Sequence, residues 1–157
     1  MARRKDTFWH RYKYKLNGLV LILPFWFLYQ QLTPTFPAVW GSQKAGPYEI
    51  TVVPSDMEPP YAHHGDYVKD FTLTFAAGKI SSIRQGYVSI GPQPMPLVKL
   101  QQGETGILHG NRHSQHVHAI APEHIARGDR LWLRIQDWQG EEHVVSWPMP
   151  HVLVSKR

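Results

Sequence analysis

The sequence of 157 residues contains no cysteine. This absence excludes disulfide bonds, thiolate zinc sites, iron–sulfur clusters and covalent attachment of c-type haem. A small domain of this kind is therefore stabilised by packing alone, even in an oxidising compartment. Any metal site must use histidine, methionine or carboxylate ligands.

Charged residues are absent between Lys15 and Lys44, and the charge differs on the two sides of this gap. The first 15 residues hold six Lys and Arg against Asp6 alone, whereas residues 44–157 hold 11 basic and 11 acidic residues. Because the net charge of +5 thus precedes the gap, the remainder offers no excess positive charge to nucleic acid, and no nucleic-acid partner is expected. A basic flank before an apolar run is instead the positive-inside signature of a membrane segment.

Sequence patterns typical of catalytic sites are also missing. The glycines are scattered and form no phosphate-binding loop, and no serine lies in a nucleophile-elbow context. The zinc-protease spacing His-Glu-x-x-His does not occur either. We therefore expect a protein that is not an enzyme.

The uncharged stretch has an apolar core at residues 18–29, with Trp and Tyr near both ends, as at the two interfaces of a membrane. No small-residue cleavage site follows, which favours an anchor over a cleaved signal peptide or a buried helix. We expect a protein of the bacterial inner membrane, in contact with the lipid bilayer. Its predicted parts are a basic cytoplasmic tail at 1–15, a single transmembrane helix at 16–32, a Pro/Gly tether at 33–47 and a periplasmic domain at 48–157.

The predicted periplasmic domain shows the period-2 pattern of β-strands. Residues 70–75 and 130–138 alternate between apolar and polar side chains, and a hairpin is predicted between 97–102 and 105–109. Seven or eight such strands predict a mainly β fold, an immunoglobulin-like β-sandwich. The side chains expected to face its core are Phe71, Leu73, Phe75, Leu131, Leu133 and Ile135.

Histidines are concentrated in one part of this domain, where five of the ten fall within 16 residues. His116 and His118 are two apart on a predicted strand, so both side chains leave the same face within reach of one ion. A loop carrying His109 and His113 could supply a further ligand. Imidazole is neutral near pH 7 and suits copper, iron, zinc and nickel, so these four histidines are a candidate site for copper or iron. Histidines on a solvent-facing strand that contact only water or a partner are the alternative.

Three segments resemble a small single-pass inner-membrane protein found beside the PepSY-type reductase of pyoverdine-type siderophore systems. They are Gly86-Tyr-Val-Ser-Ile-Gly-Pro92, Gly106-Ile-Leu-His-Gly-Asn-Arg-His113 and Arg130-Leu-Trp-Leu…Ser146-Trp-Pro-Met-Pro150. The resemblance implies a non-catalytic accessory subunit of a complex that reduces ferric siderophore iron to ferrous iron in the periplasm. It also implies a membrane protein complex as partner.

Two other functions fit the same plan of basic tail, apolar segment and small β domain. One is a periplasmic, histidine-rich copper carrier or sensor that works independently of a complex. The other is an oxidase-assembly factor, because the plan is similar to that of FixH-like proteins, although no motif of that family is matched. Tight binding of copper by the protein is required only by the copper carrier.

Overall fold

A computed structural model describes residues 7–35 and 37–155, which form two compact units that divide after Thr35. The first unit is helix α1, Phe8–Leu32, which contains Pro24 and buries none of its side chains within the chain. The helix begins eight residues before the predicted span and so includes part of the predicted basic tail, whose residues 1–6 lie outside the described part.

The predicted membrane span at 16–32 finds no support in the structure. Within the described ranges, no helix combines the length with the apolar character that crossing a membrane requires. The physical reason lies in the composition of α1, where Asn17, Pro24, Gln30 and Gln31 interrupt the apolar residues and several aromatic residues carry polar atoms.

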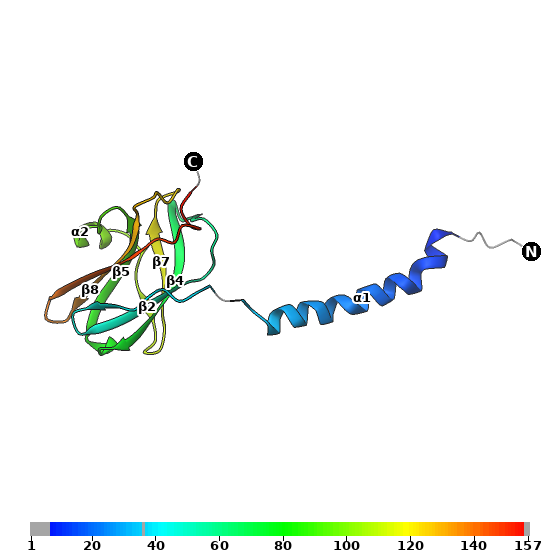
Figure 1. Ribbon diagram of the computed structural model, residues 1–157, viewed down its shortest axis with the longest axis horizontal. Helices are drawn as coiled ribbons and strands as arrows, with labels where there is room; N and C mark the ends of the chain where they lie inside the picture. The colour runs from blue at the N-terminus through cyan, green and yellow to red at the C-terminus, as the bar shows by residue number, and fades with distance from the viewer. Residues whose placement is uncertain (1–6, 36, 156–157) are drawn as a thin grey trace, which may run out of the picture. The chain divides into compact units, whose positions relative to one another are not determined.

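The second unit is a mainly β domain (Figure 1). It holds two short helical segments, η1 (Ile80–Ser82) and α2 (Leu97–Leu100). Its strands are β1 (Gln43–Ala45), β2 (Tyr48–Pro54), β3 (Tyr61–His63), β4 (Asp66–Ala77), β5 (Ile83–Gly91), β6 (His109–Gly110), β7 (Gln115–Ala121), β8 (Arg130–Asp137) and β9 (Glu142–Pro148).

The strands form one nine-stranded sheet with the order β1-β2-β4-β7-β5-β8-β9, to which β3 adds beside β4 and β6 beside β7. Two antiparallel sets are joined where β5 and β7 pair in parallel at Ser89 and Ile120. The end strands β1 and β9 lie in contact, which gives a sandwich- or barrel-like domain. The mainly β prediction is thereby confirmed.

Alternating burial along the strands confirms the predicted core. Leu131, Leu133 and Ile135 of β8 are fully buried, as are Phe71 and Leu73 of β4. Phe75, which lies closer to the end of β4, is partly buried against the same core. From Asp70 to Thr74 of β4 and from Gln115 to Ala119 of β7, buried residues alternate with more exposed polar ones, so this part of the two strands carries polar side chains outward.

Two segments differ from the sequence-based expectation. Residues 97–100 form the short helix α2 instead of a strand. Pro96 precedes this helix with a φ of −58°, which is the value that the proline ring favours. Strand β1 also lies inside the predicted tether, and Trp40 packs edge-on against Phe71 with 5.4 Å between the ring centres. The β domain thus includes residues on the N-terminal side of position 48.

Candidate functional site

The candidate site begins on β7, where the alternation places His116 and His118 on the outward face. Their neighbours Val117 and Ala119 are fully buried in the core, which fixes the orientation of the strand. The two imidazole rings lie perpendicular to each other with 4.9 Å between their centres. The two side chains therefore share one face within reach of one ion, as the sequence predicts.

Strand β4 supplies a carboxylate to this pair. Asp70 lies directly opposite His118 in the antiparallel ladder, and its Oδ1 is 2.5 Å from Nδ1 of His118. In the tautomer that carries its proton on Nδ1, His118 donates to this carboxylate and keeps a lone pair on Nε2. Metal-binding histidines usually donate one ring N–H to a carboxylate or carbonyl oxygen in this way, which leaves the other ring nitrogen to bind the ion.

Strand β6 brings His109 to the other side of the pair. His109 lies opposite His116 in the ladder, and the two ring centres are 5.5 Å apart. Nδ1 of His109 is 3.1 Å from the backbone oxygen of Ile107, a contact that directs Nε2 away from that carbonyl. Two imidazoles bound to one ion at about 2.0–2.1 Å have ring centres roughly 5 Å apart, so the spacing of His109 from His116 is close to that of shared ligands.

Strand β3 completes the surface with Tyr61 and His63. The Tyr61 hydroxyl lies 3.1 and 3.2 Å from the two carboxylate oxygens of Asp70 and donates to that group. The His63 ring stacks on that of His118 with 5.3 Å between centres. We call this surface the histidine face; its residues are Tyr61, His63, Asp70, His109, His116 and His118.

Three side chains of the histidine face present ligand atoms that converge. One ligand atom each from Asp70, His116 and His118 lies within 4.8 Å of the other two. Two imidazoles and one carboxylate with open positions form a donor set that suits ferrous iron, and imidazole-rich sets also suit copper and zinc. A groove of about 210 Å³ runs beside these residues and is lined in part by His63, His109 and His118, which gives solvent access to an ion bound there.

The electrostatic environment of the face favours a neutral ligand at His116. Burial lowers the pKa of His116 below the usual value, and the neighbouring His118 and His109 lower it further, against the opposing effect of Asp70. The pKa of Tyr61 is raised, first by burial and then by its hydrogen bond to Asp70, so its hydroxyl remains a donor. His116 is therefore available as a ligand at a lower pH than an ordinary histidine.

The four predicted ligands are not all brought together. His109 joins His116 and His118, whereas His113 lies exposed in the turn between β6 and β7, where its Nε2 accepts a hydrogen bond from Nε of Arg112 at 2.9 Å. His124 belongs to the same run of histidines in the sequence, but it lines a different groove. Proximity along the chain therefore does not decide which histidines meet.

Sequence reasoning missed Asp70 and Tyr61 as parts of the site and did not place His63 beside His118. The alternation of residues 70–75 places Asp70 outward, but the ladder register that sets it opposite His118 pairs residues 48 positions apart. The local sequence signal for β3 is the glycine of the pair His64-Gly65. In the structure both residues have positive φ and form a two-residue turn between β3 and β4. Such a turn is typical of hairpins and would have placed His63 next to β4.

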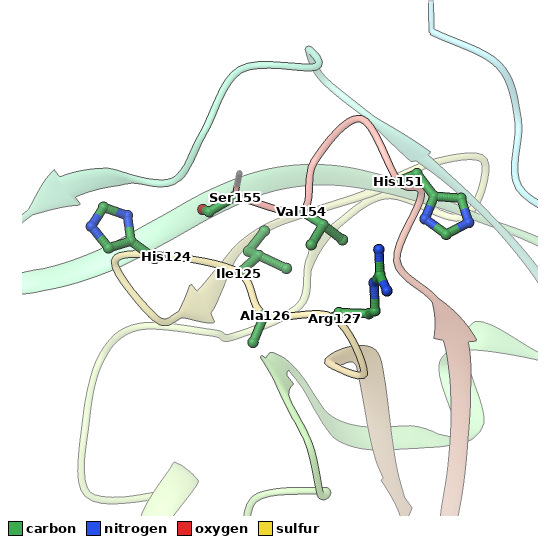
Figure 2. Close-up of a pocket in the computed structure, with 7 residues that line it drawn as sticks. All are labelled: His124, Ile125, Ala126, Arg127, His151, Val154 and Ser155. Atoms are coloured by element: carbon green, nitrogen blue, oxygen red, sulfur yellow. The ribbon is translucent and has the colours of Figure 1, made fainter. Parts of the chain in front are cut away.

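Another groove, larger than the one beside these residues, is separate from the histidine face. Its volume is about 1180 Å³, and Figure 2 shows His124 at the opposite end of the view from Arg127 and His151, with Ile125 and Val154 between them. Within residues 7–35 and 37–155, its side chains form no group of three converging metal ligands. The groove therefore gives no reason to place the metal chemistry there.

A family model described as "Uncharacterised conserved protein UCP029505" matches residues 8–150 of the chain. The chain therefore belongs to this family. No curated protein and no solved structure matches it.

Proposed function

We propose that this member of the UCP029505 family is a non-catalytic accessory protein that binds a transition-metal ion on its histidine face. The observation that carries the proposal is the convergence of Asp70, His116 and His118 from two paired strands onto one point. Both strands pack their inward side chains into the core of the domain, so the backbone under the ligands is rigid. Rigid strands hold metal ligands more closely to one geometry than loops do.

We assign the site to iron in the first place. Two histidines and one carboxylate with open positions form the donor set of many ferrous iron sites. This agrees with the role that the resemblance implies, in which the protein serves the reduction of ferric siderophore iron and its release as ferrous iron. In that role the domain takes up the ion, and reduction belongs to a partner subunit.

The proposal places the protein at the bacterial inner membrane, with α1 beside the helices of a partner complex and the β domain in the periplasm. The charge asymmetry across residues 15–44 supports this orientation, and α1 exposes all of its large apolar side chains within the chain. We also propose that the domain is an immunoglobulin-like sandwich, which the two antiparallel strand sets support.

Anaerobic titration of the purified full chain with ferrous iron tests the metal assignment. We expect one ion on the histidine face, and no binding there when His116→Ala and His118→Ala are combined. The matched control combines His113→Ala and His124→Ala, which also removes two exposed imidazoles but leaves the face intact. Equal iron binding by both double variants would contradict the proposal.

A copper carrier is the second candidate, because His63 and His109 add imidazoles around the pair on β7. Copper(II) binds nitrogen ligands more tightly than ferrous iron in almost any such site, so affinity alone does not separate the two functions. Co-purification from membranes separates the two functions. An accessory subunit should be recovered with a membrane protein complex that depends on the histidine face, whereas an independent carrier should be recovered alone and loaded with copper.

The orientation is tested separately with reporter fusions at Arg157. A phosphatase that is active only in the periplasm should be active there, and a reporter that works only in the cytoplasm should be silent. The reverse pattern would contradict the proposed location but would leave the metal site untouched.

A further inference from the structure

The hairpin of β8 and β9 carries a second cluster of potential metal ligands, far from the histidine face in the sequence. Asp137 ends β8, Glu141 lies in the turn and His143 follows on β9. One ligand atom of each lies within 4.8 Å of the other two.

The turn holds the Asp137 carboxylate in a defined place, whereas the Glu141 side chain is 71% exposed. The backbone nitrogen of Asp137 donates to the backbone oxygen of Glu141 at 3.1 Å, and the backbone nitrogen of Glu141 donates to Oδ1 of Asp137 at 2.8 Å. Gly140 has a φ of 87°, which favours glycine and allows this tight turn. One oxygen of the Asp137 carboxylate therefore accepts a hydrogen bond in the turn, and the other remains available to bind an ion.

His143 provides the independent observation that points to a ligand. Its side chain is only 9% exposed, and its ring packs edge-on against Tyr48 with 5.7 Å between centres. A Cβ on Gly46 would come within 2.4 Å of the ring, so the glycine is what leaves space for it. In the described part of the chain no hydrogen bond is made by this imidazole, and the acid nearest to Nδ1 is Glu141, at 4.0 Å.

Within the described residues, the ring nitrogens of His143 are not among the fully buried polar atoms that lack a partner, so they remain accessible to water or to an ion. Coordination of an ion would satisfy the ring nitrogen of His143 and would also neutralise the two carboxylates beside it. Asp137 and Glu141 alone would be an ordinary pair of surface acids. The buried imidazole that converges with them distinguishes this cluster.

We propose that Asp137, Glu141 and His143 form a second divalent-cation site, with zinc as the preferred ion. Two carboxylate oxygens and one imidazole nitrogen are zinc ligands, and water completes the coordination. The ion would hold His143 between the β8–β9 turn and the residues Gly46 and Tyr48. This is the place where β9 and β1 lie in contact without pairing in the sheet order, so the site would stabilise the closure of the domain.

The test is a zinc titration of the full chain carrying His116→Ala and His118→Ala, which removes the histidine face beforehand. We expect one equivalent of zinc to bind to this background. Adding Glu141→Gln should weaken the binding by roughly tenfold or more, since a ligand is lost while a side chain of the same size remains. Glu58→Gln is the matched control, because Glu58 is an exposed acid outside both clusters.

Asp137→Asn serves as a second variant, since it keeps an oxygen for the turn and removes the charge. Thermal unfolding gives an independent readout: zinc should raise Tm in the background and in the Glu58→Gln variant, but not in the Glu141→Gln variant. Absence of zinc binding to the background, or equal affinity in the Glu141→Gln variant, would overturn the proposal. Neither result affects the histidine face, whose ion is measured by comparing the parent with the background.

Discussion

The histidine face and the β8–β9 cluster bring potential ligands together in opposite ways. The face gathers residues from β3, β4, β6 and β7, which span positions 61–118, and most of its donors are imidazoles. The β8–β9 cluster lies within one hairpin, from Asp137 to His143, and most of its donors are carboxylates. Non-local pairing thus builds a nitrogen-rich site on a rigid sheet, and a local turn builds an oxygen-rich site.

This difference predicts different metal preferences. Nitrogen donors favour copper and the later divalent metals, whereas carboxylates favour harder ions, with zinc accepted by both types. The two sites should therefore be separable by mutation in one protein.

The largest expected effect is a crossed loss of binding. Combining His116→Ala and His118→Ala should abolish copper binding on the face, because no two neighbouring imidazoles of β7 remain, and should leave zinc on the hairpin. Glu141→Gln should weaken zinc binding on the hairpin by roughly tenfold or more and leave copper on the face. Isothermal titration of each variant with each metal measures this. Loss of both metals in either variant would mean that the two clusters are not independent.

The next effect concerns Asp70. Asp70→Asn should weaken metal binding on the histidine face by about 10–100-fold, whether its carboxylate binds the ion or orients His118. Asp66→Asn is the matched control on the same strand, because that carboxylate accepts a hydrogen bond from Thr105 instead. Equal affinities of the two variants would remove Asp70 from the site.

Much of the fold follows from sequence patterns, but the site does so only in part. Alternation identifies Leu133 as buried and His116 as outward, because side-chain direction is a local property of a strand. Which strand lies beside β7 is decided by packing of the whole domain, so the contact of Asp70 with His118 could not be predicted. The β8–β9 cluster, in contrast, lies inside one hairpin, where residues close in the sequence are also close in the fold.

Helix α1 shows another limit of sequence reasoning. Absence of charge from Lys15 to Lys44 identifies an unusual segment, and its residues 16–32 are indeed helical. The absence of charge does not measure how apolar the helix is, since proline, amide and aromatic residues also lack charge. The transmembrane interpretation was therefore stronger than the charge pattern alone allowed.

A smaller effect is expected from pH. Metal binding to imidazole requires the neutral form, so affinity on the histidine face should fall as pH decreases below about 6.5. Because burial lowers the pKa of His116, this ligand stays neutral further into the acid range than an ordinary histidine. Copper affinity measured against a competing chelator from pH 7.5 to 5 tests this. Affinity that does not change over this range would contradict imidazole ligation.

The smallest expected effect comes from Tyr61, which touches the site only through other side chains. Tyr61→Phe removes the hydroxyl that donates to Asp70 but keeps the aromatic ring on β3. A hydrogen bond to a carboxylate contributes about 1.5–3 kcal/mol at most, and solvent can replace much of it at this exposed position, so a few-fold loss of metal affinity is expected. Tyr67→Phe is the control, since the Tyr67 hydroxyl interacts with Glu123. If Tyr61→Phe leaves the affinity unchanged, strand pairing alone positions Asp70, and β3 serves the site only through His63.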